Sequence, residues 1–105
     1  MEADSGFAEA LFNLSHIAIA AANPPEAIGY LERAVDVDPD YADAVYNLAA
    51  LYIQLDRFAD AAPLLERHIR LDPKSASTHE ARILLLACRA VMGRTPNLTD
   101  EAVGD

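Results

Sequence analysis

The sequence repeats itself with a period of 34 residues, and this period constrains the fold more than any other feature. Asp38-Pro39 recurs as Asp72-Pro73. When residues 8–41 are superposed on residues 42–75 without a gap, 11 of the 34 positions are identical. A period of this length is typical of arrays in which one small structural unit stacks on the next. We therefore expect a solenoid that contains two such units.

Each unit is expected to fold into two helices joined by a short turn. Across residues 44–55, apolar side chains recur at three- and four-residue spacing, which is the pattern of one apolar stripe on a helix. Asp56 and Arg57 interrupt the stripe, which resumes at Phe58 and stops before Pro73. The two stripes predict a helical hairpin.

Capping residues mark the helix boundaries in the rest of the chain. The segment 23–26, Asn-Pro-Pro-Glu, is a strong helix start, because it combines an N-cap residue, prolines in the first turn and a capping-box glutamate. A fifth helix is expected over residues 76–92, opened by Ser75 or Ser77 and closed by Gly93. The polar segment that follows is too short to supply a further helix.

The expected fold is all-α, a solenoid of two helix-turn-helix repeats plus a C-terminal helix. The chain divides into a lead-in (1–7), two repeats (8–41 and 42–75), a C-terminal capping or interface helix (76–93) and a polar tail (94–105).

These patterns resemble the tetratricopeptide repeat (TPR) family. The family signature is matched in the second repeat by Val45, Leu48, Ala49, Tyr52, Ala61, Leu65 and Pro73. The first repeat offers Leu11, Leu14, Ser15, Ala18, Ala27, Leu31 and Pro39. The resemblance implies a right-handed superhelix whose concave face is lined by the first helix of each repeat. The small residues Ser15, Ala27, Ala49 and Ala61 would let the paired helices approach closely.

Three residues depart from the signature. Ala18 replaces an aromatic residue, His68 stands where a small residue is expected, and Pro63 falls inside a helix, where it removes a backbone hydrogen bond. These departures affect the expected local geometry and leave the expected fold unchanged.

The chain offers no constellation of residues for catalysis, so we expect no enzymatic activity, no cofactor and no metal site. None of the histidines, His16, His68 and His79, lies three or four residues from another histidine or from a cysteine. Cys88 is the only cysteine, in an apolar segment without a neighbouring base, and is expected in the core or at an interface. The sequence also lacks a glycine-rich phosphate loop and a nucleophile elbow.

Charge and hydropathy restrict the partners. The net charge is −9, and residues 1–50 hold nine acidic side chains against Arg33 alone. Such a surface repels nucleic-acid phosphates and attracts a basic peptide, or it simply keeps the protein in solution. No apolar run exceeds six residues, so no membrane-spanning segment is expected. The N-terminus lacks the pattern of a secretory signal, which predicts a cytoplasmic protein.

The resemblance to TPR proteins implies that a peptide or a partner protein binds on the concave face. The matching positions are Glu9, Phe12, Asn13, His16, Ile19, Asp43, Tyr46, Asn47, Ala50 and Ile53. This apolar and aromatic strip with acidic flanks suits a ligand with apolar anchors and basic flanks. Alternatively, Phe12 and Tyr46 simply pack between helices. TPR domains that bind acidic chaperone tails carry basic residues where this chain has Glu9, Ser77 and Ala81, so binding of that type is not expected.

The fifth helix is apolar around most of its circumference. We expect one stripe, Ile83, Leu86, Ala87 and Ala90, to dock on the preceding hairpin. The remaining apolar residues are then predicted to form a homodimer interface, unless the tail covers them: Leu84, Leu85, Cys88, Val91 and Met92.

The leading functional hypothesis is a protein–protein interaction module, a scaffold or adaptor. The alternatives are a self-association unit and a C-terminal regulatory appendage of a larger bacterial protein, the latter by analogy alone.

Overall fold

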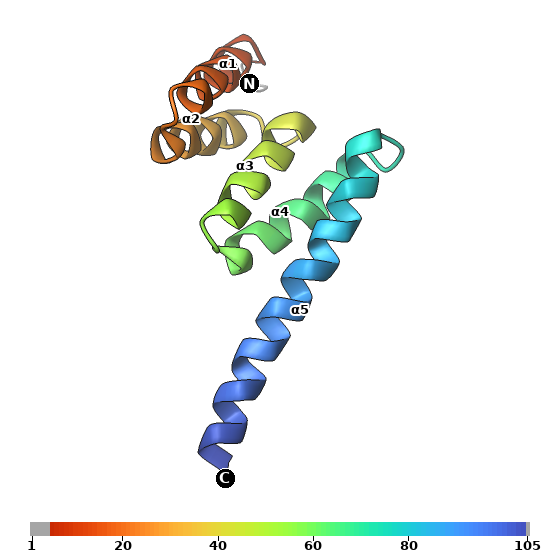
Figure 1. Cartoon of the computed structure of the whole chain (residues 1–105). Helices are drawn as coiled ribbons and strands as arrows, with labels where there is room; N and C mark the ends of the chain where they lie inside the picture. Colours follow the sequence, from red (N-terminus) through yellow and green to blue (C-terminus); the bar gives the residue numbers. More distant parts are fainter. Residues whose placement is uncertain (1–4, 105) are drawn as a thin grey trace.

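The computed structural model describes the backbone of residues 5–104 and the side chains of residues 6–93. Its helices are α1 (Ser5–Ala20), α2 (Pro24–Val37), α3 (Ala42–Gln54), α4 (Phe58–Leu71) and α5 (Ala76–Gly104). Each helix packs against the next one in the chain, and α1 with α2 and α3 with α4 form the two predicted hairpins (Figure 1). The predicted all-α TPR-like solenoid is therefore confirmed.

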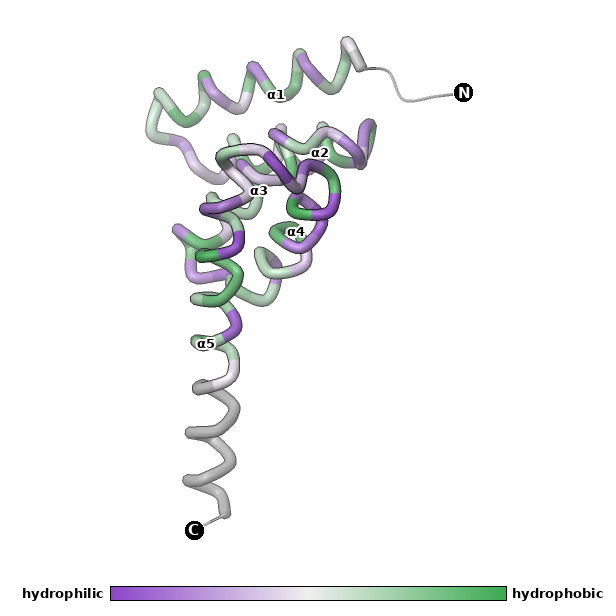
Figure 2. The backbone as a smooth tube through the Cα atoms, turned by 90° about the vertical axis from the view of Figure 1, so that its right-hand side faces the viewer, coloured by the Kyte–Doolittle hydropathy of each residue, from purple (hydrophilic) through white to green (hydrophobic). Residues whose placement is uncertain are grey.

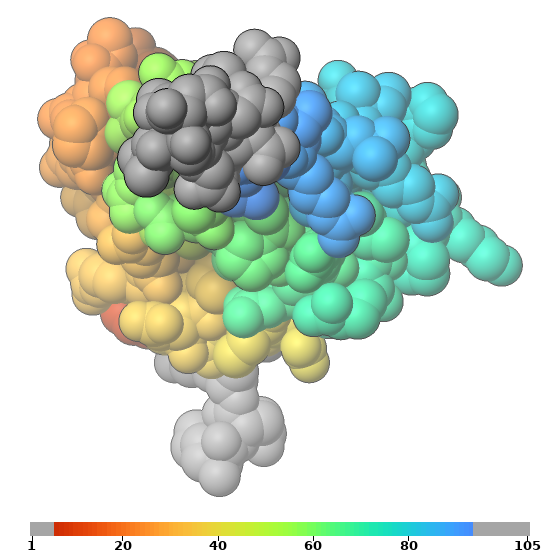
Figure 3. Space-filling view, turned by 90° about the horizontal axis from the view of Figure 1, so that it is seen from below, coloured from red at the N-terminus to blue at the C-terminus, as the bar shows by residue number. Residues whose placement is uncertain are grey.

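The order of the units in the chain is also their order in space. Figure 3 shows the second hairpin, in yellow to green, between the first hairpin, in orange, and α5, in blue. α3 has neighbours on both sides: it packs against α4 within its own hairpin and against α2 of the preceding hairpin.

Side-chain hydrogen bonds cap the starts of α2 and α5, whereas α3 and α4 start without one. The Asn23 side chain accepts a hydrogen bond from the backbone N–H of Glu26 at 3.3 Å and donates one to the Glu26 carboxylate at 3.1 Å, as the sequence predicts. Of the two candidate serines, Ser75 is the cap of α5, because its hydroxyl accepts a hydrogen bond from the backbone N–H of Thr78 at 3.2 Å.

The predicted end of the fifth helix at Gly93 is wrong. α5 continues to Gly104, so the backbone of the segment assigned to a polar tail is largely helical. A glycine ends a helix by adopting a left-handed conformation, and Gly93 does not adopt one, since no glycine in the described backbone has a positive φ.

Close helix packing occurs at small side chains. Ser15, Ala27, Ala49 and Ala61 are all completely buried. The hydroxyl of Ser15 donates to the carbonyl oxygen of Phe12 at 2.5 Å, so this buried polar group is satisfied. The expectation that these positions allow close approach of the paired helices agrees with their burial.

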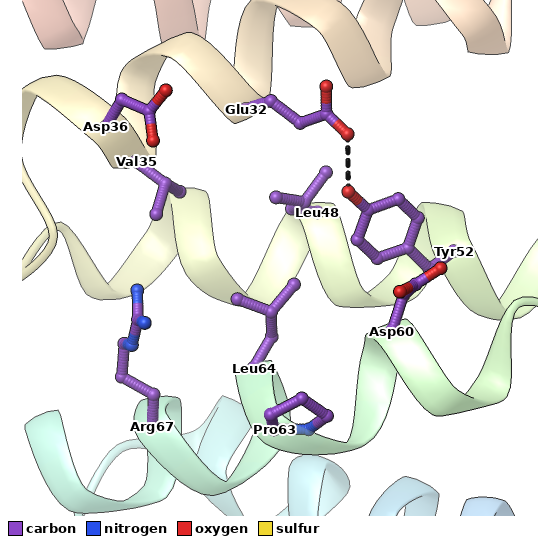
Figure 4. A pocket seen from close by; sticks show the side chains of 9 residues that line it. All are labelled: Glu32, Val35, Asp36, Leu48, Tyr52, Asp60, Pro63, Leu64 and Arg67. Atoms are coloured by element: carbon purple, nitrogen blue, oxygen red, sulfur yellow. Dashed lines mark hydrogen bonds between the residues drawn. The ribbon is translucent and has the colours of Figure 1, made fainter.

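A hydrogen bond joins the two hairpins and accounts for one departure from the family signature. The Tyr52 hydroxyl on α3 donates to the Glu32 carboxylate on α2 at 2.5 Å (Figure 4). The equivalent position in the first repeat is Ala18, where the described chain offers no preceding helix for an aromatic side chain to reach. Of these two equivalent positions, the one with an aromatic residue is the one that can link two repeats.

The apolar stripe of α5 that was expected to form a dimer interface packs inside the molecule. Leu85 and Cys88 are buried, and Leu84 and Met92 are half-buried against the core. Val91 is also half-buried. The predicted interface is therefore wrong.

The opposite stripe, expected to dock on the preceding hairpin, faces outward instead, with Ile83 55% and Leu86 66% exposed. The start of α5 determines this rotation. The buried Thr78 donates its hydroxyl to the carbonyl oxygen of Asp72 at the end of α4, and the small Thr78 and Ala81 turn the same side of α5 toward α4. Leu85 and Cys88 lie on that side.

We predict that Ala27→Leu and Ala61→Leu each lower the free energy of unfolding by about 1–3 kcal/mol, because a larger side chain cannot fit between the packed helices. Urea denaturation measures the change. Ala59→Leu, at an exposed position of α4, is the matched control and should stay within about 0.5 kcal/mol of wild type. An unchanged denaturation midpoint for either buried variant would contradict the repeat alignment.

A second prediction concerns pH. Burial and the hydrogen bond to Glu32 raise the pKa of Tyr52 to about 12, whereas a tyrosine in an unfolded chain titrates near about 10. From pH 10 to 12 the unfolded chain therefore loses a proton that the folded chain keeps. The free energy of unfolding should fall by about 2 kcal/mol over this window.

Tyr52→Phe removes the hydroxyl of Tyr52 and with it this pH-dependent contribution to stability. The difference in the free energy of unfolding between wild type and variant should therefore shrink as the pH rises from 10 to 12. Urea denaturation at pH 9, 10, 11 and 12 measures it. A difference that stays constant would show that the folded protein does not hold the Tyr52 proton.

Candidate functional site

The predicted binding residues form one stripe on α1 and the equivalent stripe on α3. The stripe on α1 is Glu9, Phe12, His16 and Ile19, and the stripe on α3 is Asp43, Tyr46, Ala50 and Ile53. We call these two stripes, with Asn13 and Asn47 beside them, the first-helix face. Glu9, Asn13, His16, Ile19 and Asp43 are exposed, and the other five are half-buried.

On α1, the stripe is turned toward the start of α3 by an aromatic cluster. The ring centroid of Phe12 lies 4.6 Å from that of His16, edge-on, and 5.1 Å from that of Tyr41, the residue before α3. Phe12 packs against the core with part of its surface and leaves the rest accessible. It can therefore support the fold and contact a ligand at the same time.

On α3, Tyr46 lies where three helices meet. Its hydroxyl donates to the Glu80 carboxylate on α5 at 3.5 Å, and its ring lies 5.1 Å from the imidazole of His68 on α4. His68 is completely buried, with Nδ1 2.8 Å from the carbonyl oxygen of Ala42 and Nε2 2.9 Å from the hydroxyl of Ser77. A rigid imidazole therefore supports the ring of Tyr46 from below the face.

Tyr41, His68 and Glu80 belong to this site and were not among the predicted binding residues. The period of 34 residues carries a signal for Glu80, since it relates Phe12 to Tyr46 and Tyr46 to Glu80. His68 is noticeable in the sequence only as a departure from the family signature. Its contact with Tyr46 depends on how α3 and α4 pack.

Acidic side chains surround both aromatic clusters. Burial, and then the charges of Glu9, Asp43 and Asp38, raise the pKa of Tyr41. Burial and the neighbouring Glu80 carboxylate raise the pKa of Tyr46. The face therefore combines aromatic surface with negative potential, an arrangement that suits cationic groups carried by a ligand with apolar anchors.

The described side chains contain no group of three or more His, Cys, Asp or Glu residues that could hold a metal ion. Cys88 is buried, and burial raises the pKa of its thiol, which disfavours the reactive thiolate. Within the same residues, no helix is long and apolar enough to cross a membrane.

A cavity of about 300 Å³ is formed by residues outside the first-helix face. It is lined by α2, α3 and α4, with apolar walls from Val35, Leu48 and Leu64 and an acidic rim that includes Asp36 (Figure 4). None of the predicted binding residues lines it. No feature of the sequence predicted this cavity.

Comparisons with known proteins agree with this architecture. A sequence profile described as tetratricopeptide repeat matches residues 18–83. No curated protein matches the sequence at a significant level.

Among solved structures, the chain is similar to a tetratricopeptide repeat domain protein from Salinibacter ruber. The solution structure is 25% identical, with 78% of this chain and 86% of that chain covered and a TM-score of 0.68. A crystal structure from the same organism is 24% identical, with 80% and 98% covered and a TM-score of 0.71.

The crystal structure of the MamA protein is 23% identical, covers 96% of this chain and has a TM-score of 0.71, but this chain spans only 55% of that protein. At this identity the likeness shows the fold alone. The profile match, however, extends over more than half of the sequence and includes most of both repeats. The chain belongs to the tetratricopeptide repeat family.

Proposed function

We propose that this protein is a non-enzymatic adaptor that binds a partner polypeptide on its first-helix face. Proteins with TPR folds act generally as protein–protein interaction modules, and this chain's own residues supply a suitable surface. The observation that carries the proposal is the environment of Tyr46, whose ring is supported by a buried histidine, whose hydroxyl is oriented by Glu80, and whose side chain is still partly accessible. Such pre-positioned aromatic residues are common anchors of binding energy.

The preferred ligand is a peptide with apolar anchors and basic flanks. Phe12, Tyr46 and Ile53 offer partly accessible apolar surface. Glu9, Asp43 and Glu80 surround it with carboxylates, and the first 50 residues contain Arg33 as their only basic side chain apart from histidine. Opposite charges on the ligand would speed its encounter with the face and reject acidic competitors.

We predict that a ten-residue peptide with leucine and phenylalanine anchors and lysine flanks binds at least tenfold more tightly than the same peptide with glutamate flanks. Its affinity should fall as salt rises from 50 to 500 mM, because exposed charges are screened beyond about 8 Å at physiological ionic strength. Fluorescence anisotropy measures both. Equal affinities for the two peptides would contradict the charge preference.

In the same assay, Tyr46→Ala should weaken binding of the basic peptide about fivefold to thirtyfold, as expected for loss of an aromatic anchor. Tyr30→Ala is the matched control, since Tyr30 is also half-buried but lies on α2, outside the first-helix face. A similar loss in both variants would assign the effect to general destabilisation.

A second candidate function, self-association, is favoured by the outward stripe of α5. Ile83 and Leu86 are more than half exposed, although the equivalent residues of α3, Ala49 and Tyr52, are buried. Fully burying a large apolar side chain contributes about 1.5–3 kcal/mol, so a two-fold contact between these stripes could hold a weak homodimer. The alternative that the chain is a C-terminal regulatory appendage of a larger bacterial protein, and its cytoplasmic location, remain predictions from the sequence.

If α5 forms this contact, wild-type protein should show a mass that rises with concentration toward a dimer, and Leu86→Glu should remain monomeric. Light scattering behind size exclusion measures the mass. Ile17→Glu, which replaces an equally exposed residue at the other end of the molecule, should behave as wild type. A monomer at every concentration would exclude self-association as the function of this stripe.

A further inference from the structure

α1 and α3 occupy equivalent places in the two repeats, yet they bury different amounts of their surfaces. Both bury the stripe represented by Leu11, Ser15 and Ala18 on α1 and by Val45, Ala49 and Tyr52 on α3. α3 buries a second stripe as well, Ala44, Leu48 and Leu51. The equivalent residues of α1 are all exposed: Ala10, Leu14 and Ile17.

The neighbours of the two helices explain this difference. The main partner of α1 is α2, whereas α3 packs against both α4 and α2. The shared stripe therefore faces the second helix of the same repeat, with Tyr52 at its edge reaching Glu32 of α2 as well, and the additional stripe of α3 faces α2 of the preceding repeat. On α1 this additional stripe is equally apolar but uncovered, with Leu14 39% and Ile17 65% exposed.

The second helices of the two repeats, α2 and α4, also carry equivalent residues on equivalent surfaces. Asp60, Leu64 and Arg67 of α4 line the cavity of about 300 Å³ together with Leu48. Their equivalents on α2 are Glu26, Tyr30 and Arg33, and these three also line a cavity, of about 290 Å³. Leu14 is the equivalent of Leu48, and α1 lies at the outer end of the molecule (Figure 2). By this equivalence, the uncovered stripe of α1 and these three residues of α2 belong to one surface at the outer end of the first hairpin. We call it the N-terminal end face.

The N-terminal end face closely matches the surface on which α2 sits in the second repeat. Three of its residues, Ala10, Leu14 and Arg33, are identical to their equivalents. Three others keep their character, as Ile17 corresponds to Leu51, Glu26 to Asp60 and Tyr30 to Leu64. A surface that reproduces a helix-binding surface of the same molecule suits a similar helix.

We propose that the N-terminal end face binds one amphipathic, acidic α-helix of a partner polypeptide, seated as α2 is seated on the second repeat. This site is separate from the first-helix face and does not depend on the function proposed for that face. The spacing of Ala10, Leu14 and Ile17 is that of a seam between two packed helices, which favours a helical ligand over an extended one.

The charge of the ligand follows from Arg33. In the second repeat, the equivalent Arg67 points from α4 toward the part of α2 that carries Val35 and Asp36, and Glu32 lies on the same cavity (Figure 4). Arg33 lies over the ring of Phe7 at 5.8 Å, and the described side chains provide no carboxylate in an ion pair with it. The ligand helix is therefore expected to carry an apolar residue flanked by carboxylates, in the arrangement of Glu32, Val35 and Asp36.

The chain itself supplies the probe for a test. A peptide of residues 24–37, with capped ends and a side-chain staple on its solvent side that holds it helical, is titrated into the intact protein by fluorescence anisotropy. We expect saturable binding that Ile17→Glu weakens at least tenfold. Leu86→Glu, at a residue of the same exposure on α5, should leave it unchanged. A peptide with Asp36→Lys should bind several-fold more weakly, and Arg33→Glu in the protein should restore its affinity.

Three results would overturn the proposal. The first is absence of binding by the helical peptide at millimolar concentration. The second is binding that Ile17→Glu does not weaken, because the peptide would then occupy another site, such as the position of α2 itself. The third is a wild-type dimer in sedimentation that Ile17→Glu dissociates, because a second copy of this chain would then be the occupant.

Discussion

The structure depends on close contact between paired helices at side chains no larger than serine. Ala27, Ala61, Ser15 and Ala49 are completely buried where the helices of each hairpin meet. Because small residues recur 34 positions apart, the two hairpins have similar geometry, and residues at equivalent positions lie on equivalent faces. Both proposed binding surfaces follow from this regularity. One runs along the first helices, and the other lies at the outer end of the first hairpin.

Among the first helices of the repeats, only α3 packs, within the described chain, against the second helix of its own repeat and that of the preceding repeat. It therefore shows which surfaces of a first helix are covered inside the array. α1 and α5 each lack one of these neighbours in the described part of the chain. α1 leaves open the stripe that would face a preceding repeat, and α5 leaves open the stripe that would face a second helix of its own repeat. Ile17 and Leu86 are the most exposed large apolar residues of these two stripes. Exposed apolar surface of this kind favours association with other helices.

The period in the sequence was sufficient to predict both hairpins, and the resemblance to the TPR family implied the residues of the first-helix face. Phe12 and Tyr46 are half-buried on that face, so the alternatives of packing and binding are not exclusive for them. The support beneath Tyr46 could not be predicted, because His68 reaches it from α4 through tertiary packing. Glu80 could have been found from the period, which places it one repeat beyond Tyr46.

The sequence by itself determined that the chain forms hairpins, the start of α2 at Asn23, the break between α3 and α4 at Asp56 and Arg57, and which residues share a stripe. Only the tertiary structure decided which stripe of α5 is buried. Both stripes are apolar, so hydrophobicity does not distinguish them. The choice depends on the rotation of α5 about its axis, which is set by the hydrogen bonds of Ser75 and Thr78 at its start and by the small side chains of Thr78 and Ala81 that face α4. Leu85 and Cys88 are buried as a consequence, and Ile83 and Leu86 remain exposed.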